Sequence, residues 1–244
     1  KIIESAGISP DDSVLEIGAG LGNITADIAA AAKKVTAVEF DKGLFSVLKE
    51  NAGARENIEP VCGDILRFDF RGAAAGCGRI KVIGNLPYYI TTPVLGRLIK
   101  NRPLISAAVL MGQKELGLRL AARPGSKAYG SITCYLNFYA DVEFIAGVKR
   151  TCFFPTPEVD SALLRFTMLE QPRLRVNDEE ALFKIIRAAF NQRRKTILSS
   201  LSNRIELGLD KAAVRRLLER AGIFAQRRPE SLSLEEFVRI SEAI

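Results

Sequence analysis

The chain has 244 residues, 48% of them hydrophobic, so it can bury a full core and is too apolar to be disordered throughout. It contains no histidine, which excludes imidazole bases, histidine-based triads and histidine-ligated metals. The net charge of +7 favours an anionic partner, and most of the excess falls in residues 171–244, with 15 basic and 10 acidic side chains.

The sequence contains no apolar run near the roughly 20 residues that a membrane span needs. It also opens on an amphipathic segment rather than on a signal peptide, so we expect a soluble, cytoplasmic protein. The four cysteines form no Cys-x-x-Cys pair, and we interpret them as buried small hydrophobes in a reducing compartment, with no metal site. The four positions are Cys62, Cys77, Cys134 and Cys152.

The first part of the chain alternates short apolar runs with segments of helical spacing. The predicted strands are Ser13–Ile17, Val35–Phe40, Ile58–Val61, Ile80–Ile83 and Ala107–Met111. The predicted helices are Asn23–Ala32, Lys42–Ala52 and Thr92–Lys100. Continuous apolar strands separated by helices are typical of a parallel sheet covered on both faces, so the predicted fold class is α/β.

The pattern changes after residue 129. Two longer strand-like pieces, Phe138–Val148 and Val159–Leu169, flank a proline-rich turn and predict an antiparallel hairpin at the sheet edge. A polar stretch over 172–178 is a predicted linker, and the remaining segments predict short amphipathic helices. These are Glu179–Phe190, Arg193–Leu201, Lys211–Arg220 and Leu234–Ala243. We therefore expect one domain over 1–170 and a small all-α domain over 171–244.

A glycine-rich turn follows the first predicted strand, in the run Glu16-Ile17-Gly18-Ala19-Gly20-Leu21-Gly22. Such a turn brings backbone amides close to a bound ligand. Glu39 ends the second strand, where a carboxylate can accept both hydroxyls of a ribose. The pattern predicts a nucleoside-containing cofactor, although a dinucleotide-binding turn with G-x-G-x-x-G spacing has a comparable layout.

Asp64 follows the third strand and could accept a hydrogen bond from an adenine amino group or cap a helix. Asn85-Leu86-Pro87-Tyr88 follows the fourth strand. An amide, a rigid proline turn and an exposed aromatic at one point suit gripping the exocyclic amine of a flat base. The two motifs together predict a methyl donor meeting a base.

The chain resembles the small-subunit rRNA adenine-N6,N6-dimethyltransferases, which are class I methyltransferases that use S-adenosylmethionine. The resemblance rests on the glycine turn, Asn85–Tyr88 and six further segments in family order. These are Val38–Asp41, Gly63–Leu66, Gln113–Glu115, Gly125–Gly130, Phe153–Ser161 and Phe190–Thr196. It implies a Rossmann-like sheet and an enzyme that dimethylates adenines of small-subunit rRNA during ribosome biogenesis. Nothing in the sequence suggests an obligate oligomer, so we expect a monomer.

The resemblance also implies roles for individual residues. The implied cofactor-binding residues are Glu16, Gly18, Gly20, Glu39, Asp64, Ile65 and Asn85. The implied catalytic residues are Asn85, Leu86, Pro87, Tyr88 and Phe153. We expect the Asn85 amide oxygen and the Leu86 carbonyl to accept the two N6 hydrogens, and Tyr88 and Phe153 to sandwich a flipped-out base. For Phe154 we expect core packing instead.

Basic residues complete the predicted site. A cluster at the start of a predicted helix, with two more cations, is expected to contact RNA phosphates, whereas alone it would be a solvated helix face. These residues are Arg193, Arg194, Lys195, Lys114 and Lys127. The family usually begins with a segment that folds over the cofactor, and this sequence starts downstream of it, so we expect reduced activity.

Four alternatives stay open. The nearest is an adenine-N6 methyltransferase of large-subunit rRNA, against which the Asn191–Lys195 and Gly125–Gly130 segments argue. DNA adenine methyltransferases typically have proline where Leu86 stands. A non-catalytic ribosome-assembly or transcription factor on the same fold would not need intact Gly18, Glu39, Asp64 and Asn85. A NAD dehydrogenase would give the Asn85 motif no role.

Overall fold

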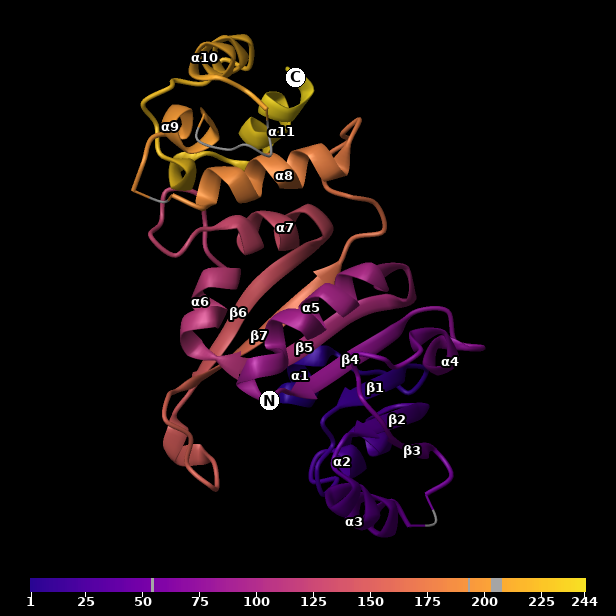
Figure 1. The fold of residues 1–244 in the computed structure, drawn as a ribbon. Helices are drawn as coiled ribbons and strands as arrows, with labels where there is room; N and C mark the ends of the chain where they lie inside the picture. The colour runs from indigo at the N-terminus through magenta and orange to yellow at the C-terminus, as the bar shows by residue number, and fades with distance from the viewer. Residues whose placement is uncertain (54, 193, 203–207) are drawn as a thin grey trace. The chain divides into compact units, whose positions relative to one another are not determined.

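The computed structural model describes residues 1–53, 55–192, 194–202 and 208–244 (Figure 1). The chain divides into two compact units, which we call the sheet unit and the helical unit. The sheet unit comprises 1–117 and 140–170, and the helical unit comprises 118–139 and 171–244. One division thus falls at residue 170, but the helical unit also takes in an internal segment that the sequence analysis assigned to the first domain.

The sheet unit contains a seven-stranded sheet with the order β3-β2-β1-β4-β5-β7-β6. Its strands are β1 (Ser13–Ile17), β2 (Lys34–Glu39), β3 (Ile58–Cys62), β4 (Ile80–Asn85), β5 (Ile105–Gln113), β6 (Ala140–Val148) and β7 (Ser161–Met168). The first five are parallel, and β7 pairs antiparallel with both β5 and β6. This confirms the predicted α/β class with an antiparallel hairpin at one edge.

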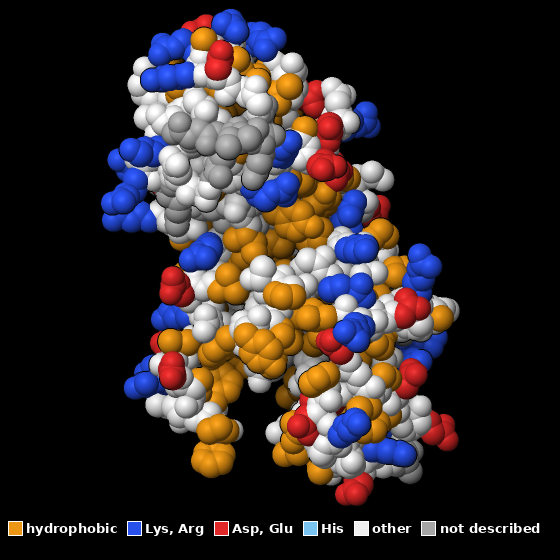
Figure 2. All heavy atoms as spheres, viewed as in Figure 1, with side chains coloured by type: hydrophobic (Ala, Val, Ile, Leu, Met, Phe, Trp, Pro, Cys, Tyr) orange, Lys and Arg blue, Asp and Glu red, His pale blue; other side chains and the backbone are white. Residues whose placement is uncertain are grey.

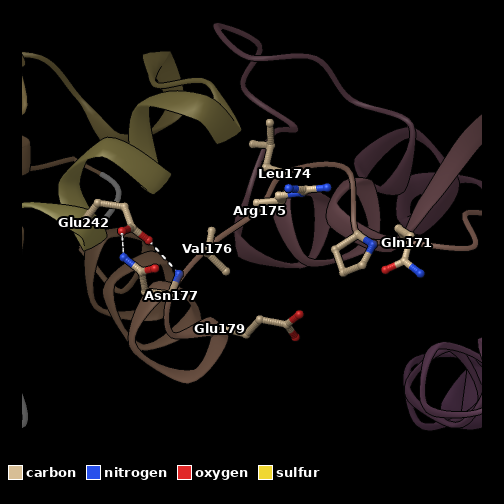
Figure 3. A pocket seen from close by; sticks show the side chains of 8 residues that line it. Gln171, Leu174, Arg175, Val176, Asn177, Glu179 and Glu242 are labelled. Atoms are coloured by element: carbon tan, nitrogen blue, oxygen red, sulfur yellow. Dashed lines mark hydrogen bonds between the residues drawn. The ribbon is translucent and has the colours of Figure 1, made fainter.

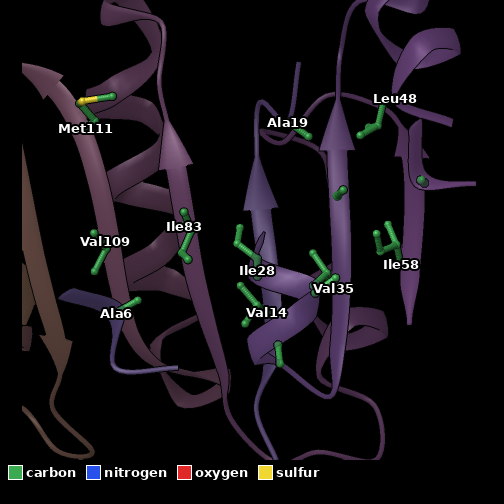
Figure 4. Packing of buried hydrophobic residues seen from close by; sticks show 14 of the residues in the cluster. Ala6, Val14, Ala19, Ile28, Val35, Leu48, Ile58, Ile83, Val109 and Met111 are labelled. Carbon is green, nitrogen blue, oxygen red and sulfur yellow. The ribbon is translucent and has the colours of Figure 1, made fainter. Parts of the chain in front are cut away.

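In the sheet unit one helix precedes β1, and each of the others follows a strand along the chain. The helices are α1 (Ile2–Ala6), α2 (Thr25–Ala31), α3 (Lys42–Ala52), α4 (Phe70–Ala74) and α5 (Thr91–Lys100). Strands β1, β2 and β4 bury consecutive residues because the helices pack against them. Figure 4 shows part of the resulting core, in which Val14, Val35 and Ile83 from three strands meet Ile28 and Leu48 from α2 and α3.

The antiparallel pair places the β6–β7 connection at the carboxyl edge of the parallel strands. Gln113, at the end of β5, pairs with Ser161 at the start of β7, which in turn pairs with Val148 at the end of β6. The connection over 149–160 therefore lies at the same edge as the ends of β4 and β5. It contains a short 3₁₀ turn, η3 (Arg150–Cys152).

The helical unit is built from α7 (Ser131–Tyr139), α8 (Glu179–Phe190), α9 (Ile197–Ser202), α10 (Lys211–Arg220) and α11 (Leu234–Glu242). Helix α6 (Lys114–Leu120) leads into it from β5. Phe138 and Tyr139 of α7 pack edge-on or tilted against Phe183 of α8. Two sequence expectations were wrong here, because Phe138 lies in a helix instead of starting a strand, and residues 194–196 precede α9 instead of belonging to it.

The expectation of four buried cysteines was also wrong. Only Cys134 is buried, whereas Cys62 and Cys152 are exposed at the end of β3 and in the β6–β7 connection. The described part of the chain has no cluster of ligands that could hold a metal ion. Nor does any helix within it have the length and hydrophobicity to cross a membrane.

Candidate functional site

The glycine loop connects the buried end of β1 to α2. Gly18, Gly20 and Gly22 have φ angles of 70°, 60° and 84°, in the left-handed region that favours glycine. A Cβ on Gly18 would lie 3.5 Å from the backbone oxygen of Asn85. The loop therefore passes directly beside the end of β4, so two motifs 67 positions apart in sequence are neighbours in space.

Glu39 ties this loop to the end of β2. One carboxylate oxygen accepts a hydrogen bond from the backbone nitrogen of Gly20 at 2.8 Å, and the other accepts from that of Asp41 at 2.8 Å. Each oxygen keeps a further lone pair, so the carboxylate can still accept from ligand hydroxyls. The carboxylate is thus held in place beside the loop before a ligand arrives.

Glu16 is the buried acid of the loop, with only 1% of its surface exposed. Burial raises the pKa of its carboxyl to about 7, a hydrogen bond from the Thr25 hydroxyl at 2.6 Å opposes the rise, and the charge of Glu39 adds to it. A carboxyl in this state is close to half protonated at neutral pH. It can therefore respond to a positive charge placed beside the loop.

The ends of β2 and β3 supply further groups. Asp64 accepts a hydrogen bond from the backbone nitrogen of Leu66 at 2.9 Å, so it caps a turn and does not cap a helix. Ile65 is buried beside it. Phe40, which the sequence analysis did not assign to the site, exposes 73% of its surface directly after Glu39. A large exposed apolar side chain next to a buried carboxylate is a signal that only the structure shows.

The Asn85–Tyr88 turn leaves the sheet at the end of β4. The Leu86 backbone nitrogen donates to Met111 of β5 at 3.1 Å, and the Leu86 side chain is buried, which anchors the turn. Asn85 itself is exposed. The expectation of an exposed Tyr88 was wrong, because its ring is half-buried and its hydroxyl lies 3.1 Å from that of Ser161. Tyr89 is the exposed aromatic, at 83%.

A pocket of about 260 Å³ opens at this turn. It is lined by Asn85–Tyr88, Phe153–Pro155, Pro157 and Ser161. The structure thus brings together all five predicted catalytic residues. Phe153 is partly buried and packs against the core, whereas Phe154 is fully exposed, so the expectation of core packing for Phe154 was wrong.

A second pocket, of about 550 Å³, lies in the helical unit (Figure 3). Glu242 reaches across it and accepts hydrogen bonds from the backbone nitrogen of Asn177, at 2.8 Å, and from the Asn177 side chain. Arg175 and Glu179 also line the pocket. None of the predicted site residues does so, and two of its polar groups bind each other, so we assign it no part in the chemistry.

The predicted RNA-binding residues fall in both units. Lys114 begins α6, with its Nζ 3.7 Å from an Asp160 oxygen. Lys127, Arg194 and Lys195 are exposed in the helical unit. Arg194 and Lys195 lie in the turn before α9, and Arg193 lies outside the described residues. The structure leaves their role as a prediction.

The family model for ribosomal RNA adenine dimethylase matches residues 1–244. The ribosomal RNA small subunit methyltransferase A of Moorella thermoacetica is 44% identical over 252 residues, covering 100% of this chain and 86% of that protein.

Two solved structures are similar over nearly the whole chain. A dimethyladenosine transferase from Plasmodium falciparum has a TM-score of 0.85 at 27% identity and covers 98% of this chain and 92% of that one. The 23S rRNA methyltransferase ErmE has a TM-score of 0.76 at 27% identity and covers 99% and 94%. The resemblance inferred from the motifs is confirmed, and this chain belongs to the ribosomal RNA adenine dimethylase family.

Proposed function

We propose that this protein transfers methyl groups from S-adenosylmethionine to N6 of adenines in small-subunit rRNA, giving N6,N6-dimethyladenine. The observation that carries the proposal is the close approach of the glycine loop to Asn85, which lines a pocket of about 260 Å³ together with the other predicted catalytic residues. The similarity of the whole chain to the ribosomal RNA small subunit methyltransferase A of Moorella thermoacetica, at 44% identity, supports the small-subunit substrate.

The residues at the carboxyl edge fit S-adenosylmethionine. Gly18 and Gly20 have no side chain to cover the backbone of the loop, and a Cβ on Gly20 would meet nothing within 4 Å. Glu39 is fixed to accept ribose hydroxyls, and Asp64 and Ile65 follow the next strand. Phe40 offers an exposed ring on which adenine can stack. When bound, the cofactor supplies an electrophilic methyl group on a positively charged sulfur.

Glu16 gives this loop a carboxyl whose protonation can change when a ligand binds. Its carboxyl is close to half protonated at neutral pH, and a cation placed nearby would favour the ionised form. We assign Glu16 the role of supporting the loop and complementing the positive charge, rather than of direct contact, because its side chain is buried.

The target pocket can activate the adenine amine without a general base. Its lining contains no carboxylate, amine or imidazole among the described residues. The Asn85 amide oxygen and the Leu86 carbonyl oxygen can accept the two N6 hydrogens, which turns the nitrogen lone pair out of the ring plane. Each transfer would form one N–C bond as the methyl–sulfur bond of the bound cofactor breaks, which leaves a neutral thioether, and one N6 proton is released to water. Tyr88 and Phe153 would hold the base between them.

The test separates chemistry from cofactor binding. Asn85→Ala should abolish dimethyladenine formation in unmethylated small ribosomal subunits, measured by mass spectrometry, and should lower cofactor affinity less than Glu39→Ala does. Glu39→Ala and Phe40→Ala should instead weaken cofactor binding, measured by calorimetry. Normal turnover in Asn85→Ala would contradict the mechanism. Product formed only in large-subunit rRNA or in DNA would refute the substrate, and cofactor binding without any product would favour a non-catalytic assembly factor.

We propose that five basic residues contact rRNA phosphates. They are Arg193, Arg194, Lys195, Lys114 and Lys127. Arg194→Glu with Lys195→Glu should weaken subunit binding and lower the slope of log affinity against log salt by roughly 1 to 2. Lys49→Glu with Lys100→Glu is the control, since both side chains are exposed in the sheet unit and the change in net charge is equal. Equal losses in both variants would mean that only net charge matters.

The remaining parts of the proposal follow from this substrate. The helical unit is the proposed RNA-binding domain and the sheet unit the catalytic domain. A protein that modifies ribosomal subunits during their assembly acts in the cytoplasm in bacteria, and we propose that it does so as a monomer. Sedimentation of the purified chain at micromolar concentration tests the last point, and a stable dimer would contradict it.

A further inference from the structure

Phe154 is a large apolar side chain that is fully exposed at the rim of the target pocket. Figure 2 shows hydrophobic side chains at the tip of the β6–β7 connection, beside a notch in the surface of the sheet unit. Exposing an aromatic ring to water forgoes the stabilisation that burial would give. A ring in this position suggests that something else covers it when the protein works.

The backbone around Phe154 is anchored at both ends. The Arg150 backbone nitrogen donates to an Asp160 carboxylate oxygen at 3.1 Å, and the Lys114 backbone nitrogen donates to the Asp160 carbonyl at 3.0 Å. On the near side, Phe153 packs against the core. These contacts fix the connection, so it presents Phe154 outward while Phe153 points inward.

The pocket is small. Its volume of about 260 Å³ lies below the roughly 300–1,000 Å³ of clefts that hold drug-sized ligands. With the target base inside it, as proposed above, the next nucleotide of the RNA would lie at its rim. Phe154 is the exposed aromatic ring of the lining, so it stands where an adjacent base would leave the pocket.

The flanking side chains suit an RNA strand. Lys149 and Arg150 precede Phe154 in the same connection and are both exposed. Cations next to an aromatic ring are the usual combination in sites that bind single-stranded nucleic acid, where the cations follow the backbone and the ring stacks on a base. An acidic or purely apolar partner would not use both features.

We infer that Phe154 stacks on the unpaired base adjacent to the target adenine and thereby positions the strand during transfer. The inference rests on the proposed function. It assigns the two phenylalanines different tasks: Phe153 contacts the target ring inside the pocket, and Phe154 contacts its neighbour outside. Phe154 is a positioning residue, because it does not touch the reacting nitrogen.

The test compares three RNA hairpins by fluorescence anisotropy. One hairpin has an intact loop around the target adenine, and the other two lack the base on its 5′ or its 3′ side. Phe154→Ala should bind the intact RNA about tenfold more weakly than the native chain. On the hairpin that lacks the stacked base, native and variant chains should bind equally. Phe154→Trp should restore the affinity, and Phe154→Leu should not.

Cofactor affinity and melting temperature serve as controls, and both should be unchanged in Phe154→Ala because its ring is exposed. Native affinity in Phe154→Ala, equal losses on all three RNAs or full rescue by Phe154→Leu would each overturn the inference while leaving the proposed function intact. If the native chain neither binds the hairpins nor methylates small-subunit rRNA, the proposed function fails, and the inference fails with it.

Discussion

The raised pKa of Glu16 makes the stability of the fold depend on pH. The ordinary value of 4.5 applies to the unfolded chain, and burial raises the folded value to about 7. Below pH 4.5 the carboxyl is protonated in both states. Between pH 4.5 and pH 7 the unfolded chain releases this proton while the folded chain keeps it. The unfolded state is therefore stabilised relative to the folded state, and the free energy of unfolding falls as pH rises.

The size of the effect follows from the shift. A difference of about 2.5 in pKa, at 1.36 kcal/mol for each unit, corresponds to about 3 kcal/mol between pH 4.5 and pH 7.5. Glu16→Gln removes this term, because an amide does not ionise but can still accept the Thr25 hydrogen bond. The free energy of unfolding of the variant, minus that of the native chain, should therefore increase by about 3 kcal/mol across that range.

Urea unfolding followed by circular dichroism at several pH values measures the difference. Any constant cost of the buried amide cancels, because only the change with pH is compared. Glu50→Gln, which removes an exposed carboxylate from α3, is the matched control and should change stability by less than about 0.5 kcal/mol at each pH. A Glu16→Gln advantage that does not vary with pH would refute the reasoning.

Two further predictions concern packing and charge. Gly117→Ala should lower the free energy of unfolding by about 1–3 kcal/mol, since its Cβ would lie 2.8 Å from that of Ala162. Gly96→Ala in α5 is the control, because its Cβ would meet nothing within 4 Å and the change should not destabilise the protein. Equal melting temperatures for the two variants would contradict the clash. Arg227→Met should cost about 1–3 kcal/mol at pH 7 by removing the partner of Glu236. Because the Arg227 hydrogen bond lowers the pKa of Glu236, the loss in urea unfolding should shrink as pH falls below 4.5, and a pH-independent loss would count against it.

The catalytic edge could be predicted from sequence because parallel strands end at one side of a sheet. Glu39, Asp64 and Asn85 each follow an apolar run, so the runs alone placed their side chains at a common edge. The glycine spacing added the loop beside them. The assignment needed no knowledge of the strand order.

The errors arose where pattern carries little information. In Ser131–Tyr139 the apolar and aromatic residues are not confined to one face of a helix, so the helical period is weak and the end of the segment resembles a strand. Its aromatic residues pack against α8 in the structure. Phe153 and Phe154 lie in a proline-rich turn, where neither the strand nor the helix period says which ring points inward. Phe40 was missed for a related reason, because an aromatic at the end of an apolar strand is usually core.

The segment 118–139 has a consequence for anyone who divides this protein. A fragment ending at residue 170 would keep α7 but lose α8, and with it the Phe183 ring that packs against Phe138 and Tyr139. The truncated chain would carry an uncovered aromatic helix and would be prone to aggregate. A fragment of the sheet unit that stays in solution would need a short polar linker in place of 118–139 as well as the new end, so a single cut in the gene cannot separate the two units.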